Sequence, residues 1–173
     1  SLENNASARA YGAQLFRREL LNGVTSFAYM FVSSGIACPI IYNALPDYGV
    51  AVGAGEAGHM VMDPEGPLCR CGNRGCLEAL ASEHAVIRSC HRAVNMGQAK
   101  TLSDICGGKE PSLKEILEAQ EMGDRDVEAI VDTAIFNLAL ATANIDNLTR
   151  PDVILFEAEI LNSQRNRDKF MEI

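Results

Sequence analysis

Four side chains that bind metals well lie in one short stretch near the middle of the chain. They are His59, Cys69, Cys71 and Cys76, in the pattern His-x9-Cys-x-Cys-x4-Cys. Three thiolates and one imidazole form a closed tetrahedral ligand set for Zn2+. Because this set leaves no open position for water, we expect a structural zinc that shapes its loop. The alternative is a reduced, cysteine-rich loop that is empty or holds metal only adventitiously.

Two glutamates flank the predicted metal ligands. Glu56 precedes His59, and Glu78 follows Cys76. Ionised carboxylates accept hydrogen bonds, so the pair could bind a small molecule beside the metal. Taken alone, they are more typical of solvated carboxylates at helix ends. Their position on both sides of the metal ligands reverses that preference, and it favours binding a small molecule over reacting with one.

Two asparagines near the start of the chain are further candidates. Asn4 and Asn5 open a pattern that predicts a helix, which Asn22-Gly23 ends. Asparagine is a preferred N-cap residue, so capping and ligand binding are equally open for both.

The elements that must position these residues alternate as in an α/β protein. The apolar run Thr25–Val32 predicts a strand, and Ile36–Tyr42 predicts its return partner. Pro39 inside the return segment indicates an edge strand or a distortion, because proline has no N–H to donate. The glycines between residues 46 and 58 indicate a loop that approaches a ligand closely.

The second half of the chain reads as helices followed by a strand. A single helix is predicted over 77–95, a second over 112–121 with the capping-box pattern Ser-x-x-Glu, and a long third over 124–148. A strand follows over 153–156. The segment 162–173 is polar and weakly patterned, and we expect it to fray.

Composition and charge restrict the class of protein. The 173 residues contain 47% hydrophobic residues, enough for one domain with a core, and carry a net charge of -8 without a cluster of Lys and Arg. The chain itself is therefore a poor candidate for binding nucleic acid. We find no signal peptide and no membrane-length apolar run, and we expect a cytoplasmic protein. The remaining cysteines and histidines are given no chemical role; they are Cys38, Cys90, Cys106, His84 and His91.

Five segments together carry a resemblance to a known family. They are ENNAS (3–7), SSGI (33–36), GEAGHM (55–60), CRCGNRGCLE (69–78) and RPDVILF (150–156). In this order they resemble the C-terminal part of the ROK family of bacterial sugar kinases and sugar-responsive transcriptional repressors. The resemblance implies the actin-like (ribonuclease H-like) sugar-kinase fold. Residues 1–161 would form its C-terminal lobe with an inserted zinc knuckle, while the N-terminal lobe and any winged helix-turn-helix would lie outside this chain.

The resemblance also implies roles for individual residues. Asn4 and Glu56 match family positions that bind sugar hydroxyls, and Glu78 matches a carboxylate that accepts from them. His59 matches a histidine that both ligates zinc and faces the sugar. Asn5 stands where the kinases carry their catalytic aspartate, so it is expected only to bind substrate. An amide has no basic lone pair near neutral pH and cannot act as the general base.

Two more departures from the kinase pattern also argue against phosphoryl transfer. The family's glycine-rich phosphate loop is replaced by the segment 33–39, with few glycines and with Pro39. Glu157 and Glu159 stand where the kinases have a glycine pair at the nucleotide, and two carboxylates would repel a triphosphate. We therefore expect neither ATP nor Mg2+ as a cofactor and no catalytic residue.

The function predicted on this basis is a zinc-stabilised, sugar-binding effector domain of a ROK-type transcriptional regulator. DNA would be contacted only through a domain outside this chain, and the family suggests a dimer or tetramer. The alternative is a weak or divergent ATP-dependent sugar kinase of the hexokinase or glucokinase type. A metal-dependent hydrolase is less favoured, because the zinc set is closed.

Overall fold

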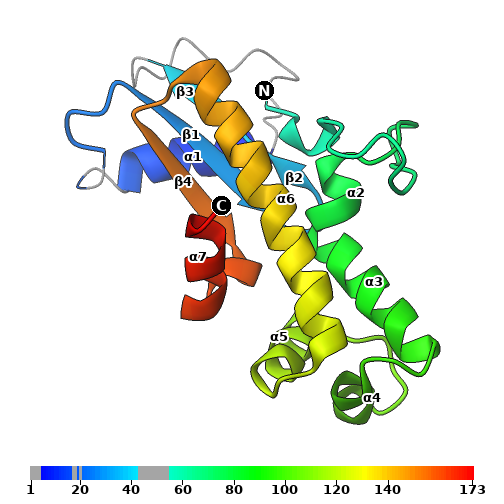
Figure 1. Ribbon diagram of the computed structural model, residues 1–173. Helices are drawn as coiled ribbons and strands as arrows, with labels where there is room; N and C mark the ends of the chain where they lie inside the picture. Colours follow the sequence, from blue (N-terminus) through cyan, green and yellow to red (C-terminus); the bar gives the residue numbers. More distant parts are fainter. Residues whose placement is uncertain (1–4, 17–18, 20, 43–54) are drawn as a thin grey trace.

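The computed structural model describes residues 5–16, 19, 21–42 and 55–173. This part of the chain contains a mixed four-stranded sheet (Figure 1). Helix α1 (Asn5–Phe16) covers one face of the sheet, and a layer of helices covers the other. The α/β class predicted from the sequence is confirmed. Helix α1 ends earlier than predicted, and residues 17, 18 and 20 lie outside the described part.

Strand β1 (Ser26–Val32) is the central strand. It pairs in parallel with β4 (Val153–Ala158) on one edge and antiparallel with β2 (Ile36–Ala37) and β3 (Ile40–Tyr42) on the other. The parallel pair brings residues 27–32 next to residues 153–158, which lie far apart in the sequence.

The return segment of the hairpin is distorted, as its proline predicts. Strands β2 and β3 continue one register against β1 but are separated at Cys38-Pro39. Pro39 has no N–H for the ladder, and the N–H of Cys38 donates instead to the carbonyl of Gly55 at 2.6 Å.

Both faces of β1 are buried because successive side chains of a strand point to opposite sides. Phe27 and Tyr29 pack in a small core with α1, whereas Met30 and Val32 pack in the larger core beneath the helical layer. This double burial explains why the strand reads as a continuous apolar run.

The residues after the last cysteine form two helices, where the sequence predicts one. Helix α2 (Leu77–Ala81) and helix α3 (Glu83–Asn95) are separated by Ser82, which is extended at φ -66° and ψ 157°. The Oγ of Ser82 accepts from the N–H of Ala85 at 3.1 Å and so caps α3. The prediction of a single helix was wrong because the helical spacing of apolar residues continues across Ser82.

Two shorter helices follow. Helix α4 (Lys100–Cys106) is absent from the predicted set. Helix α5 (Leu113–Glu121) begins with the predicted capping box. The N–H of Glu115 donates to the Oγ of Ser112 at 3.3 Å, and the N–H of Ser112 donates to the carboxylate of Glu115 at 2.7 Å.

The long helix α6 (Arg125–Thr149) lies across the helical layer and begins where the sequence predicts, with Asp124 as its N-cap. By length and composition alone it could cross a membrane. Its apolar face is instead buried against other helices, so it is the central core helix of the described part. The buried residues of this face include Val127, Val131, Ala134, Ile135, Leu138, Ala141 and Ile145.

The prediction that residues 162–173 form a frayed polar tail was wrong. Helix α7 (Gln164–Met171) packs on α6. Asn166 is fully buried, and its side chain exchanges two hydrogen bonds of 3.1 Å with Gln120. Arg165 donates to Asp132 of α6 at 3.1 Å. These contacts are largely between polar side chains, so a hydropathy pattern does not reveal them.

Candidate functional site

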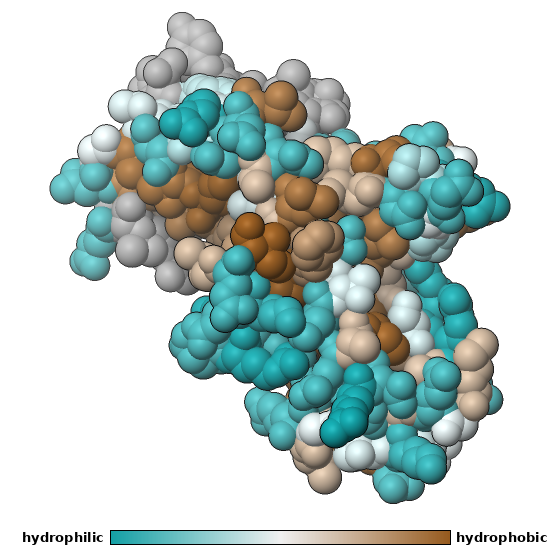
Figure 2. All heavy atoms as spheres, in the orientation of Figure 1, coloured by the Kyte–Doolittle hydropathy of each residue, from teal (hydrophilic) through white to brown (hydrophobic). Residues whose placement is uncertain are grey.

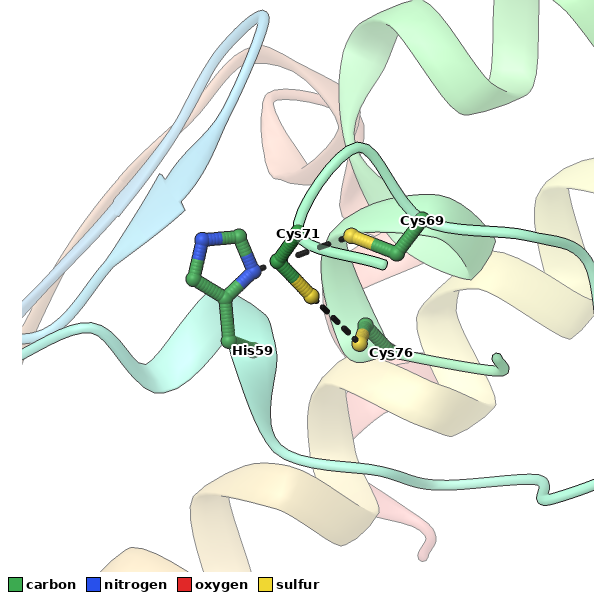
Figure 3. A group of neighbouring side chains, drawn as sticks. All are labelled: His59, Cys69, Cys71 and Cys76. Carbon is green, nitrogen blue, oxygen red and sulfur yellow. Dashed lines mark hydrogen bonds between the residues drawn. The ribbon is translucent and has the colours of Figure 1, made fainter. Parts of the chain in front are cut away.

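The four predicted metal ligands come together in space. One donor atom from each of His59, Cys69, Cys71 and Cys76 lies within 4.8 Å of all the others. The Nδ1 of His59 is 3.7 Å from the Sγ of Cys69, and the Sγ atoms of Cys71 and Cys76 are 3.6 Å apart (Figure 3). A tetrahedral zinc, with Zn–S of about 2.3 Å and Zn–N of about 2.0 Å, separates its ligand atoms by roughly 3.5–3.8 Å. The donor set and its spacing therefore fit zinc.

The loop that carries the cysteines is closed by its own backbone. The N–H of Cys69 donates to the carbonyl of Asn73 at 2.7 Å, and the N–H of Gly72 donates back to the carbonyl of Cys69 at 3.0 Å. Gly75 has a φ of +62°, and a Cβ built on it would lie 1.5 Å from the carbonyl oxygen of Asp63. Only glycine fits there, so this residue permits the tight turn before Cys76.

His59 and Glu78 lie on neighbouring elements. His59 ends the short 3-10 helix η1 (Ala57–His59), which packs against α2. A Cβ on Gly58 would lie 3.2 Å from the Cβ of Glu78, so glycine permits this close approach. The Nε2 of His59 points away from the sulfur atoms (Figure 3). One ring nitrogen therefore faces the metal ligands, and the other faces away from them.

Glu78 is buried and bound by an arginine that sequence analysis did not single out. Its residue exposure is 8%. The Nε of Arg70 lies 2.8 Å from its Oε1, and the Nη2 of Arg70 donates to its Oε2 at 3.2 Å. The N–H of Ile36 also donates to Oε2, at 3.2 Å. No regular spacing relates positions 70 and 78, so only the folded loop reveals this pair.

The other predicted ligand-binding residues are placed as follows. Glu56 is exposed at the N-cap of η1. Asn5 is the exposed first residue of α1, and its Oδ1 accepts from the Nε of Arg9 at 3.3 Å. Asn4 lies outside the described residues, as does most of the predicted glycine-containing loop from residue 46 to residue 54.

Arg9 connects Asn5 to the end of β4. Its Nη1 forms an ion pair with Glu157, and the hydroxyl of Tyr29 donates to the same carboxylate. The guanidinium carbon of Arg9 stands 4.6 Å from the ring centroid of Phe31, within the range of a cation–π contact. Two of the predicted departures from the kinase pattern, Asn5 and Glu157, therefore bind one arginine.

The turn between β1 and β2 replaces the expected phosphate loop. The N–H of Ser33 donates to the carbonyl of Gly35 at 2.9 Å. The N–H groups of Ile36 and Cys38 are also bonded within the protein, to Glu78 and Gly55. These backbone donors are already used, so they are poorly placed to hold a phosphate.

A cavity of about 770 Å3 opens near the carboxyl ends of β1 and β4. Three carboxylates line it, from Glu83, Glu157 and Glu159. Burial raises the pKa of Glu83; a hydrogen bond from Ser33 opposes this rise, and the charge of Glu159 adds to it. Two arginines also line the cavity: Arg9 is paired with Glu157, and Arg167 donates to the carbonyls of Leu161 and Asn162.

Comparison with known proteins identifies the class. The model of the ROK family matches residues 1–171. The xylose repressor of Bacillus subtilis (strain 168) is 32% identical over 162 residues, which cover 94% of this chain and 38% of the repressor. The glucokinase of Thermotoga maritima is 29% identical over 155 residues, which cover 89% of this chain and 48% of the enzyme.

A solved structure of a ROK family transcriptional regulator, a homologue of the E. coli MLC protein, superposes with a TM-score of 0.80. It is 25% identical, and the match covers 98% of this chain and 42% of the regulator. The chain belongs to the ROK family and has its actin-like sugar-kinase fold. It spans less than half the length of these relatives, which include both repressors and kinases.

Proposed function

We propose that this chain is the sugar-binding effector domain of a ROK-type transcriptional regulator and that it does not transfer phosphate. The observation that carries the proposal is the network around Arg9. Asn5 occupies the position where the family resemblance expects the catalytic aspartate, and its amide cannot take a proton from a sugar hydroxyl. General-base assistance typically accelerates a reaction about 10^2- to 10^4-fold, so its loss alone would leave a kinase with a very low rate.

The nucleotide side of the site supports the same conclusion. Glu157 and Glu159 line the cavity at the end of β4, together with Glu83. A triphosphate placed there would meet these three carboxylates against two arginines, Arg9 and Arg167, and the charge of Arg9 is already matched by Glu157. The turn after β1 offers few unused N–H groups, and Pro39 offers none.

The sugar side is intact by comparison. Glu56, His59 and Glu78 lie on and beside the metal loop, and Asn4 and Asn5 complete the set that the family resemblance assigns to sugar binding. Hydroxyl groups both donate and accept hydrogen bonds, so carboxylates, amides and an imidazole can bind them selectively. A missing partner would leave a buried polar group unsatisfied, which gives such a site its selectivity.

Zinc is proposed as a structural ion. It would be held by His59, Cys69, Cys71 and Cys76, and it would supply rigidity to the loop rather than chemistry. By fixing one ring nitrogen of His59, it would orient the other toward a ligand. DNA binding is assigned to a part of the regulator other than this chain, which carries a net charge of -8. The proposed location is the cytoplasm, where a bacterial regulator has access to both its sugar and the DNA.

The second candidate function is an ATP-dependent sugar kinase, favoured by the likeness to the Thermotoga maritima glucokinase. Isothermal titration with a panel of aldoses and N-acetylated hexosamines tests the sugar site itself. We expect one neutral sugar to bind, and we expect Glu56→Gln and Glu78→Gln to weaken that binding at least tenfold. Asp63→Asn, in the same loop, is the matched control. Wild-type protein with bound zinc that takes up no member of the panel would contradict the proposal.

A further inference from the structure

A groove of about 640 Å3 lies between the metal loop and the helices α2, α3 and α6. Three arginines line it: Arg74 comes from the metal loop, and Arg88 and Arg92 come from α3. Among the described residues, its lining contains one carboxylate, that of Glu65. Because the whole chain carries a net charge of -8, the groove has the opposite sign of charge to the protein around it.

Two of the arginines are held at the groove by the backbone. The Nη2 of Arg88 donates to the carbonyl of Ala79 at 3.1 Å. The Nη1 of Arg74 donates to the carbonyl of Gly66 at 3.4 Å. A guanidinium carries several N–H donors, so each of these bonds orients the group and leaves other donors for a ligand. Arg92 follows Arg88 by four residues and therefore lies on the same face of α3.

The positive charge of the three arginines is not balanced by ion pairs. None of them pairs with a carboxylate in the part of the chain that the structure describes. Within the same part, the side chain of Arg92 makes no hydrogen bond. The helix dipole accounts for Arg92 alone, since a cation suits the last turn of α3. Three like charges around one groove repel one another, and a bound anion would remove that repulsion.

The remaining surface of the groove suits an organic molecule. Its apolar residues are Pro67, Ala79, Leu80, Ala129 and Ile130, and its hydroxyl groups are those of Ser89 and Thr133. Figure 2 shows teal side chains of the metal loop at the right of the view, beside tan and brown ones that follow α6. The volume of the groove falls within the roughly 300 to 1,000 Å3 of small-molecule sites. We therefore expect a ligand with an anionic group and an apolar body.

Phosphate is the anionic group that fits three guanidinium groups best. A guanidinium binds carboxylate or phosphate oxygens through two parallel N–H···O bonds. One such pair of bonds occupies both oxygens of a carboxylate, whereas a phosphate monoester offers about three terminal oxygens and up to about two negative charges. Several arginines can therefore bind one phosphate group at the same time. A nucleic acid is a poorer candidate, because its backbone requires a longer basic surface and this chain is acidic overall.

The cavity at the carboxyl ends of β1 and β4 is less suited to a phosphate group. Three carboxylates and two arginines line that cavity, and Arg9 is paired there with Glu157. Three arginines and one carboxylate line the groove. A phosphate-bearing ligand is therefore attracted more strongly to the groove than to the cavity.

The groove is also separate from the proposed sugar site. Glu78 and Leu80 are two residues apart on α2, so their side chains differ by about 200° around the helix. Leu80 lines the groove, whereas Glu78 is bound by Arg70 and by the N–H of Ile36. The groove and the carboxylate of Glu78 therefore lie on different sides of α2.

We propose that the groove binds the phosphate group of a small molecule, with Arg74, Arg88 and Arg92 as the hydrogen-bond donors. Free inorganic phosphate and an organic phosphomonoester share this chemistry. The proposal does not depend on sugar binding, because none of the three arginines belongs to the proposed sugar site. Arg74 lies between the metal ligands Cys71 and Cys76, so the substitutions that test the proposal are confined to α3.

Isothermal titration in a buffer without phosphate tests the proposal. We expect phenyl phosphate to bind at one site per chain, and Arg92→Gln to weaken that binding at least about tenfold. The double variant Arg88→Gln/Arg92→Gln should weaken it at least about a hundredfold, since each substitution removes one charged donor group. Arg88→Lys should bind more tightly than Arg88→Gln, because it keeps the charge. The matched control is Arg125→Gln, which removes the same charge at the first residue of α6, outside the groove, and should leave the affinity unchanged.

Two further probes identify the chemical group that the groove binds. Benzoate has the same ring but a carboxylate, and it should bind at least about tenfold more weakly than phenyl phosphate. Inorganic phosphate distinguishes the two sources of the phosphate group. Weaker binding than phenyl phosphate assigns the groove to an organic phosphomonoester whose body contacts Leu80 and Ile130, whereas equal or tighter binding assigns it to free phosphate.

Far-ultraviolet circular dichroism separates loss of binding from loss of folding. The spectrum of Arg92→Gln should equal that of the wild type, because this side chain makes no hydrogen bond within the described residues. Wild-type protein that binds neither phenyl phosphate nor inorganic phosphate at millimolar concentration would overturn the proposal. So would equal binding of benzoate and phenyl phosphate, or equal weakening by Arg92→Gln and Arg125→Gln. Binding that Arg92→Gln leaves intact, but that Glu78→Gln or Arg167→Gln weakens, would place the probe at another site and would also overturn it.

Discussion

The guanidinium of Arg70 and the carboxylate of Glu78 form a two-point ion pair beside the metal loop, with Nε 2.8 Å from Oε1 and Nη2 3.2 Å from Oε2. The carboxylate is buried, whereas the arginine side chain is 74% exposed. Because water has little access to the carboxylate of Glu78, the guanidinium of Arg70 provides hydrogen-bond donors in place of water. A ligand hydroxyl that reaches Glu78 must share that carboxylate with Arg70.

Replacement of this arginine is expected to lower stability modestly. Arg70→Ala leaves the buried carboxylate with the hydrogen bond from the N–H of Ile36. We expect a loss of about 1 to 2 kcal/mol in the free energy of unfolding, reduced by the exposure of the arginine. Urea denaturation measures it. Arg74→Ala, in the same loop, is the control. Equal losses for both variants would show that the pair has no special role.

Loss of a metal ligand should release the zinc and loosen the loop. Cys76 is fully buried, and its Sγ is 3.6 Å from that of Cys71. We expect elemental analysis to find one zinc ion per wild-type chain and far less in Cys76→Ser, with a lower melting temperature. Cys106→Ser, outside the cluster, should keep its zinc. Full zinc occupancy in Cys76→Ser would refute the assignment.

The free thiols should differ in reactivity after the metal is removed. A hydrogen bond from the backbone of Asn73 is the main cause that lowers the pKa of the exposed Cys71. Burial raises the pKa of Cys38 and of Cys90 to about 12. Because the thiolate is the nucleophile, iodoacetamide at mild alkaline pH should label Cys71 first. Peptide mapping by mass spectrometry detects the order, and early labelling of Cys38 or Cys90 in folded protein would contradict it.

The link between β1 and β4 should weaken in acid. The carboxylate of Asp152 accepts from Thr25 and from the N–H of Ser26, and these bonds lower its pKa below the usual value. A lowered carboxyl pKa stabilises the fold above the unfolded-state value and loses that effect as pH falls through the folded-state value.

Asp152→Asn should therefore melt at a lower temperature than wild type at neutral pH, and the two melting temperatures should converge as the pH falls through the lowered pKa of Asp152. Melting curves across this range provide the measurement. Asp104→Asn serves as the control at an exposed aspartate on α4. A difference that persists unchanged into acid would rule out the charge of Asp152 as its cause.

The sequence predicted much of this structure because several signals were local. The ligand pattern of His59 and the three cysteines, the capping box at Ser112 and the strand at Ser26–Val32 each depend on neighbouring residues. Features that depend on distant residues were missed. The polar helix α7 is stabilised by the buried Asn166–Gln120 pair, which leaves no apolar periodicity.

The ion pairs of Arg9 and Arg70 were also missed by sequence analysis. Arg9 reaches Glu157 only because β1 and β4 pair in parallel, and Arg70 reaches Glu78 only after the metal loop folds back. An exposed arginine has no sequence signature that names its partner. The family resemblance implies roles for Asn5 and Glu157, but only the structure joins the two residues through Arg9.

The proposed function requires that this protein binds a sugar without phosphorylating it. The most direct test incubates the protein with MgATP and the sugar that binds it in calorimetry, and then measures sugar phosphate by mass spectrometry. We expect sugar binding to be unchanged by MgATP and no sugar phosphate above the protein-free control. We expect the same of Asn5→Asp, because Glu157 and the turn after β1 remain. Catalytic turnover to sugar phosphate by the wild-type protein would contradict the proposed function.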